Sequence, residues 1–151
     1  MGSLNFGKDT AEDKYASFLS EYKEYMDDDL SIPKAQRVAT SAWHLIDWAF
    51  ENDKCKHNFT DLSNFREALY PRCASLKIMH DLATATKHLT VSKPKADIRD
   101  TRKHAGTFSA ADFSDDFDIP RLEIEKSDGK RLSFRREMET VLNFWKSYFN
   151  Y

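Results

Sequence analysis

The chain has 151 residues, of which 40% are hydrophobic and 32% are charged, and this balance suits one domain with a well-solvated surface. Its formal net charge of −2 argues against a protein that coats nucleic acid generally, although a local basic site stays open. No apolar run approaches the roughly 20 residues of a membrane span. The first residues also lack the basic and then apolar pattern of a secretory signal, so we expect a cytoplasmic protein that does not contact membranes.

Glycine and proline are scarce, with four of each, which favours helices over an all-β design. Residues 1–9 are expected to form a loose tail. Thr10 is the N-cap candidate of a first amphipathic helix that extends to about Asp28. Ser31 starts a second helix that extends to about Asp53 and is apolar over much of its circumference. This is typical of a central helix, so we expect it in the middle of the fold.

Two further helices are expected in the middle of the chain. A short one is capped by Thr60 and extends to about Leu69, and a long one, opened by Pro71, covers Ala74–Leu89. The long helix ends before Pro94, because the residue that precedes a proline avoids helical dihedrals. It has an apolar side and a polar side, and we expect the apolar side to pack against the second helix.

Helical periodicity is lost over residues 91–120, which predicts a long irregular excursion. Its three phenylalanines are expected to enter the core: Phe108, Phe113 and Phe117. Residues 121–125 then alternate as a half-buried strand, an Asp-Gly turn follows at 127–130, and residues 131–133 return as the second strand of a hairpin. Ser133 caps a last amphipathic helix.

Together these elements predict a single, mainly α domain over residues 1–151. The expected architecture is a helical bundle of four long helices and one short helix, with the excursion and a β-hairpin, residues 91–133, inserted before the C-terminal helix. The two cysteines, Cys55 and Cys73, are expected as reduced thiols. The sequence lacks the CxxC pair that would indicate a structural zinc site. We predict no metal and no other cofactor.

Residues 99–104, RDTRKH, form an R-x-x-x-x-H pattern. In this pattern the chain resembles the HEPN superfamily, compact helical domains of toxin–antitoxin and phage-defence systems. Its metal-independent ribonucleases use such an arginine and histidine, usually paired across a dimer. The resemblance implies that Arg99 and His104 are catalytic and that Asp100 orients them. A histidine can move protons near neutral pH, and an arginine can stabilise a phosphorane.

The family's motif lies in a helix, whereas Pro94 and Gly106 around residues 99–104 predict an irregular segment here. Two other interpretations therefore stay open, a basic surface loop and a different anion-binding role. Basic residues outnumber acidic ones by six to two over residues 87–104. This segment could contact RNA phosphates, or it could pair with acidic segments of its own fold or of a second copy.

A looser similarity covers roughly residues 42–149. The strings WHLIDW, DLATATKHL, FSAADFSDDFDIPRLEIEKSDGK and NFWKSYF are similar to a family of small uncharacterised bacterial proteins. This resemblance implies a helical domain with an inserted hairpin. It implies no established activity.

A second polar set is expected between the second helix and the long helix, and it consists of His44, Asp47, Asp81, Lys87 and His88. Three interpretations are open: a buried polar network that fixes the helix register, a ligand or phosphate pocket, and a divalent metal site. The H-x-x-x-H and H-E-x-x-H signatures are absent.

Two functional hypotheses follow. The first is a HEPN-like protein of a bacterial defence or toxin–antitoxin type that cleaves RNA without metal through Arg99 and His104. The second is a non-enzymatic protein-interaction module, such as an immunity protein, an antitoxin-like protein or an accessory subunit. RNA, a partner protein and a second copy of the chain are the partners considered. Convergence of Arg99 and His104 in one cleft, especially across a two-fold axis, would favour the first hypothesis. Pairing of Arg99 with Asp112–Asp118, together with a solvent-facing His104, would favour the second.

Overall fold

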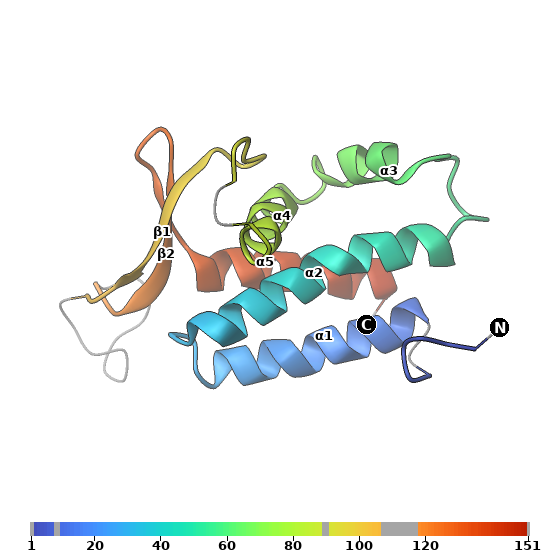
Figure 1. Cartoon of the computed structure of the whole chain (residues 1–151), viewed down its shortest axis with the longest axis horizontal. Helices are drawn as coiled ribbons and strands as arrows, with labels where there is room; N and C mark the ends of the chain where they lie inside the picture. Colours follow the sequence, from blue (N-terminus) through green and yellow to red (C-terminus); the bar gives the residue numbers. More distant parts are fainter. Residues whose placement is uncertain (1, 8–9, 89–90, 107–117, 151) are drawn as a thin grey trace.

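Helices dominate the computed structural model, which describes residues 2–7, 10–88, 91–106 and 118–150 (Figure 1). In chain order the elements are α1 (Ala11–Met26), α2 (Ile32–Asn52), α3 (Leu62–Leu69), α4 (Ser75–Ala85), β1 (Ile98–His104), β2 (Arg121–Lys126), β3 (Arg131–Ser133) and α5 (Phe134–Phe149). The predicted Phe108, Phe113 and Phe117 lie outside the described residues.

The first two helices form an antiparallel pair and begin where the sequence predicts. Thr10 caps α1 by accepting a hydrogen bond from the N–H of Asp13 at 3.0 Å. Ser31 caps α2 in the same way through the N–H of Lys34, and Pro33 lies in the first turn, where its missing N–H costs no hydrogen bond. Buried residues line α2 along its whole length, which confirms that it is the central helix.

The next two helices differ from the prediction at their ends. Asp61, and not Thr60, caps α3 by accepting from the N–H of Asn64 at 2.8 Å. Helix α4 begins at Ser75 and ends at Ala85, four residues short of Leu89. The hydroxyls of Thr84 and Thr86 donate to carbonyl oxygens one turn back, at 2.8 and 2.6 Å. Such local bonds compete with continuation of a helix, so His88 lies beyond α4.

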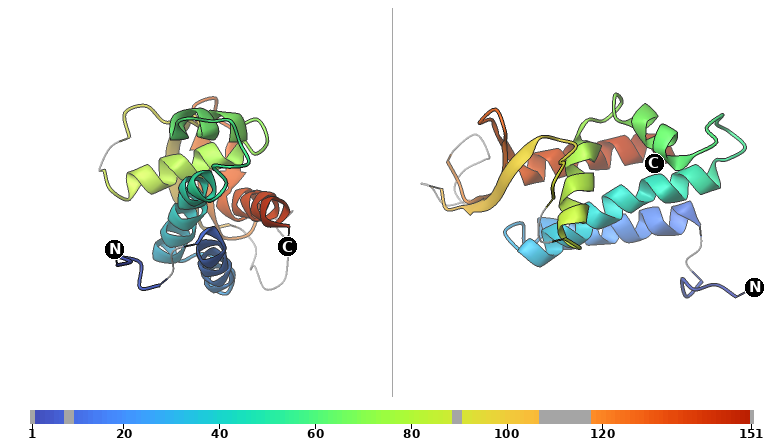
Figure 2. Two further views of the ribbon diagram at one scale, coloured as in Figure 1. Left: turned by 90° about the vertical axis from the view of Figure 1, so that its right-hand side faces the viewer. Right: turned by 45° about the horizontal axis from the view of Figure 1, so that its top comes forward.

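The arrangement is not the expected bundle of four long helices. The end-on view in Figure 2 shows α1, α2 and α5 side by side along the long axis, while α4 lies across them. Helix α4 has 11 residues, whereas α1, α2 and α5 have 16, 21 and 16. Helices α2 and α4 do pack against each other, as expected. The core lies where these helices meet, and its largest fully buried side chain is Trp145, whose indole N–H donates to the carbonyl of Ala42 at 3.1 Å.

A three-stranded antiparallel sheet in the order β1-β2-β3 lies at the end of the molecule remote from the N-terminus (Figure 1). The predicted hairpin is confirmed, and Gly129 has φ +85° in its turn. Strand β1 corrects the prediction of an irregular segment. Its residues pair with β2 from Ile98 to His104, with a bulge between Ile98 and Asp100. This pairing supplies the hydrogen bonds that local sequence patterns cannot reveal.

Two simpler expectations are also answered. None of the described helices combines the length and the apolar character that a membrane span requires. Cys55 is exposed and Cys73 is buried, both lie in described segments, and they form no disulfide, as predicted.

Candidate functional site

Strand β1 holds the arginine and the histidine of the R-x-x-x-x-H pattern at opposite ends. Arg99 donates to Glu125 Oε1 at 2.7 Å, and this contact lowers the pKa of the Glu125 carboxyl. His104 Nε2 lies 2.5 Å from Asp118 Oδ1. The two Cα atoms are five residue steps apart along an extended strand, which corresponds to about 16 Å. The structure therefore does not bring Arg99 and His104 together within one chain.

Asp100, the third residue of the predicted catalytic set, has a local role. Its Oδ1 accepts a hydrogen bond from the backbone N–H of the next residue, Thr101, at 2.8 Å. The carboxylate orients neither Arg99 nor His104 in this arrangement. Because the Thr101 N–H bonds to a neighbouring side chain and not to β2, it points to the unpaired side of the strand.

The outer face of the sheet carries a buried carboxylate among arginines. Glu123 is 2% exposed, and Arg102 donates two hydrogen bonds to its Oε1, at 2.8 and 3.1 Å. Arg121 lies 3.2 Å from Oε2 and Arg131 lies 3.8 Å from Oε1. Burial alone would raise the pKa of Glu123. The hydrogen bonds from Arg102 and the charges of Arg102, His104 and Arg121 outweigh burial, so this pKa lies below its usual value.

The structure does not gather the second predicted set, His44, Asp47, Asp81, Lys87 and His88, into one site. His44, Lys87 and His88 are exposed. Asp47 pairs with Arg66 at 2.8 Å. Asp81 is buried and accepts from the backbone N–H groups of Lys95 and Ala96, both at 2.8 Å. Within the described residues, no three His, Cys, Asp or Glu side chains could hold a metal ion.

Asp81 is therefore a structural carboxylate that fastens the segment before β1 to α4. Its histidine neighbour is His80, whose Nδ1 lies 3.2 Å from Asp81 Oδ1 and whose ring packs edge-on against Trp43. Adjacent residues point to different sides of a helix, so sequence reasoning missed this pair. The sequence signal for the role of Asp81 was a single carboxylate between apolar residues of α4. The loop that follows α4 has backbone N–H groups that need acceptors.

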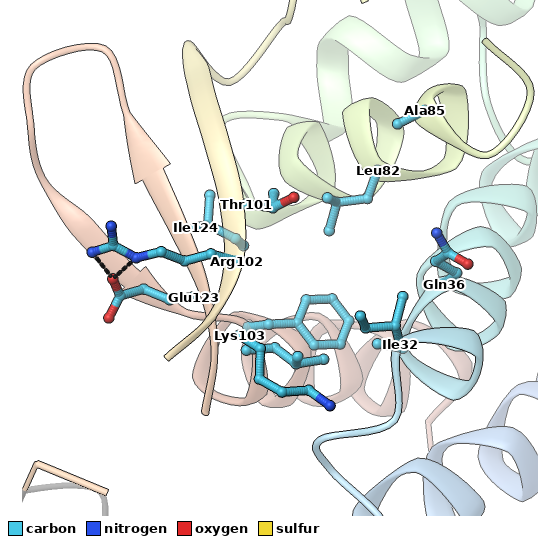
Figure 3. Close-up of a pocket in the computed structure, with 12 residues that line it drawn as sticks. Ile32, Gln36, Leu82, Ala85, Thr101, Arg102, Lys103, Glu123 and Ile124 are labelled. Carbon is cyan, nitrogen blue, oxygen red and sulfur yellow. Dashed lines mark hydrogen bonds and ion pairs between the residues drawn. The ribbon is translucent and has the colours of Figure 1, made fainter. Parts of the chain in front are cut away.

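A pocket of about 180 Å³ lies between the sheet, the start of α2, the end of α4 and the start of α5 (Figure 3). Its apolar lining consists of Ile32, Ala35, Leu82, Ala85, Leu122, Ile124 and Phe134. The rest of the pocket wall consists of Gln36, Glu123 and three consecutive residues of β1: Thr101, Arg102 and Lys103. The Arg102 side chain turns away toward Glu123 in Figure 3, so this strand contributes its backbone as well as side chains to the wall.

The free edge of β1 lies beside this pocket. Strand β1 is at the border of the sheet, and residues 99–103 are exposed. In an antiparallel ladder, alternate residues of an edge strand direct both backbone groups away from the sheet. The bond between Asp100 and the Thr101 N–H identifies Thr101, and hence Lys103, as those residues. A strand edge that pairs with no other described strand, next to an apolar pocket, is thus the most distinctive feature of this end of the molecule.

Comparison with known proteins found no matching family model, and it found no curated protein and no solved structure that is similar to this chain. The resemblance to the HEPN superfamily therefore stays a prediction.

Proposed function

We propose that this chain is a non-enzymatic protein-interaction module that binds an extended segment of a partner protein along the free edge of β1. The observation that carries the proposal is the exposed outward backbone of Thr101 and Lys103, which pairs with no other described strand and lies beside an apolar pocket. In binding by strand addition, main-chain hydrogen bonds supply affinity, and pockets for alternate side chains supply specificity. An immunity protein, an antitoxin-like protein or an accessory subunit would use such a surface.

The size of the pocket supports this mode of binding. A protein cavity of about 150 Å³ accepts a benzene-sized ligand. The pocket beside β1 has about 180 Å³, so one leucine or phenylalanine side chain of a bound segment has room in it. Ile32, which is half exposed at its border, would gain cover from the same segment.

The charges of the sheet favour a protein partner over an RNA substrate. Arg99, Arg102, Arg121 and Arg131 all lie within ion-pair distance of Glu123 or Glu125. Phosphate binding would have to break these pairs or bring more negative charge among them. The ribonuclease hypothesis also needs Arg99 and His104 to leave their carboxylates and to meet, for example across two copies of the chain.

Peptide selection tests the proposal. Random seven-residue peptides displayed on phage are selected with the wild-type protein, in parallel with Thr101→Pro and Thr101→Val. Proline removes the outward N–H of Thr101 without taking a bond from β2, and valine keeps that N–H. We expect peptides that bind the wild type and Thr101→Val but not Thr101→Pro, and that shift the amide resonances of β1. Failure to obtain such peptides would show that the proposal is wrong.

An RNA-cleavage assay tests the alternative hypothesis, that the chain is a ribonuclease. Wild type, Arg99→Ala and His104→Ala are incubated with a structured and an unstructured RNA in the presence of a chelator. We expect no cleavage above buffer from any of them. Cleavage by the wild type that His104→Ala abolishes would replace the interaction module with the metal-independent nuclease.

A further inference from the structure

We propose that the segment that binds β1 carries an acidic side chain two positions from its apolar anchor, and that Lys103 selects this acidic group. The inference rests on the proposed strand addition and names the chemistry of the partner. Thr101 and Lys103 are two residues apart on the same face of β1, and both line the pocket. Partner residues opposite them are then also two apart, because side chains of a strand alternate with a period of two.

Lys103 differs from the other basic residues of β1 in its partners. Arg99 pairs with Glu125 at 2.7 Å, Arg102 with Glu123 at 2.8 Å, and His104 with Asp118 at 2.5 Å. No carboxylate in the described part of the chain lies within ion-pair distance of Lys103. Among the described residues, carboxylates thus compensate the positive charges of β1 except that of Lys103, which lies beside the pocket.

Lys103 is placed where its charge can contribute to recognition of a bound segment. In Figure 3 its ammonium group lies at the border of the pocket, on the side of Ile32 and away from the guanidinium group of Arg102. A segment seated in the pocket would exclude water from one side of this group. An ion pair in such a place is stronger than one that is open to solvent all round, and the wrong charge is rejected.

A second copy of β1 is a poor occupant of the same edge. If two β1 strands paired antiparallel about Thr101, each Lys103 would lie opposite Arg99 of the other copy. Each Asp100 would lie opposite Arg102, whose guanidinium group already pairs with Glu123. If the two strands were centred on Arg102, the two Arg102 side chains would lie opposite each other. If they were centred on Lys103, the two Lys103 side chains would lie opposite each other. Like charges directly opposite each other destabilise a strand pair. A different protein segment with an acidic residue avoids this repulsion.

The test uses synthetic peptides with blocked ends and the sequence Thr-Thr-Leu-Thr-X-Thr-Thr, in which X is Asp, Asn or Lys. A second series has the reverse order, so that both strand directions are covered. Dissociation constants are measured by titration against wild type, Lys103→Glu and Lys93→Glu. Lys93 is exposed and lies outside the pocket, so Lys93→Glu controls for net charge. Thr101→Pro reports whether binding uses the edge of β1.

We expect the Asp peptide of one series to bind the wild type about three- to fivefold more tightly than the Asn peptide, and the Lys peptide to bind most weakly. Lys103→Glu should invert this order, whereas Lys93→Glu should keep it. Salt should reduce the preference. If all three peptides bound the wild type equally and Thr101→Pro abolished this binding, the role of Lys103 would be wrong. Strand addition would then still hold. Absence of binding to the wild type at millimolar peptide would count against both proposals.

Discussion

The helical body and the sheet end of this molecule are built by different interactions. In the body, α1, α2, α4 and α5 meet through apolar side chains, and several of the largest are completely buried: Phe18, Leu45, Ile46, Leu76, Met79 and Trp145. At the sheet end, β1 and β2 face outward with arginines and glutamates in register, and β1 is exposed along most of its length. The body therefore supplies most of the stability, and the sheet end offers a chemically varied surface.

This difference teaches where function can reside. Side chains in a close-packed body cannot change without cost, whereas an exposed strand edge can accept a partner with little rearrangement. The two regions are joined by Asp81, which fixes the backbone just before β1, and by Phe134, which belongs to α5 and lines the pocket. Substitutions in the body should consequently change stability, and substitutions at the edge should change binding.

The largest effect is expected from Trp145→Ala in the body. The substitution leaves a cavity among fully buried side chains and removes the hydrogen bond to the Ala42 carbonyl. We expect the free energy of unfolding to fall by about 3–5 kcal/mol, measured by urea denaturation. Trp48→Ala is the matched control, because this indole is only partly buried and should cost about 1 kcal/mol. Equal losses for the two tryptophans would contradict the division between body and surface.

A smaller loss is expected from Asp81→Ala, which disconnects the body from the sheet. Two backbone N–H groups, of Lys95 and Ala96, would lose a buried carboxylate. We expect a loss of about 2–3 kcal/mol and faster amide exchange in β1. Asp47→Ala, which removes the half-exposed pair with Arg66, should cost less than about 1 kcal/mol. If Asp47 proved the costlier aspartate, the structural role of Asp81 would be wrong.

Glu123→Gln should have a still smaller effect that depends on pH. Three arginines lose their common charge partner, but all three retain access to solvent, so we expect about 1–2 kcal/mol at pH 7. The folded state lowers the pKa of Glu123 below its unfolded value. Its contribution is therefore complete above about pH 4.3 and is lost as the pH falls through the folded pKa.

Urea denaturation between pH 3 and pH 7 checks this prediction. The difference between wild type and Glu123→Gln should shrink below about pH 4. A difference that grows toward acid pH would show that the carboxylate destabilises the fold. Glu125→Gln is the comparison on the same strand face, since Glu125 has Arg99 as its main partner and is less buried than Glu123. Because Arg99 also lowers the pKa of Glu125, its difference from wild type should shrink toward acid pH as well, but it should be smaller at pH 7.

Sequence reasoning succeeded where neighbouring residues decide the structure. The caps at Thr10, Ser31 and Ser133 and the Asp-Gly turn depend on contacts within four residues, and the structure has all of them. The central position of α2 followed from its apolar circumference. These features are local, so one sequence contains the information needed to predict them.

Sequence reasoning failed where distant residues decide. Strand β1 depends on pairing with β2, whose residues lie about 20 positions later, and Thr101 and Arg102 show no strand pattern of their own. The expected grouping of Asp81 with His88 assumed a helix that in fact ends at Ala85. The pocket beside β1 combines five separate parts of the chain, from α2, α4, β1, β2 and α5, so no motif could indicate it.

The smallest effect on stability, and the sharpest test of the edge, is expected from Asp100→Ala. The Asp100 carboxylate occupies the outward N–H of Thr101 in the free protein, so a bound strand must displace it. Removing this exposed group should change the free energy of unfolding by less than about 0.5 kcal/mol. It should also tighten binding of a peptide selected on the wild type by about two- to fivefold.

Asp128→Ala is the matched control for this prediction. Asp128 also accepts a backbone N–H, that of Lys130 at 2.9 Å, but it does so in the hairpin turn, away from the free edge of β1. Its loss should weaken the turn slightly and leave peptide affinity unchanged. If Asp128→Ala tightened binding as much as Asp100→Ala, the gain would come from removing negative charge and not from opening the edge. Weaker binding by Asp100→Ala would mean that its carboxylate helps to hold the partner, and the edge at Thr101 would then not be the contact surface.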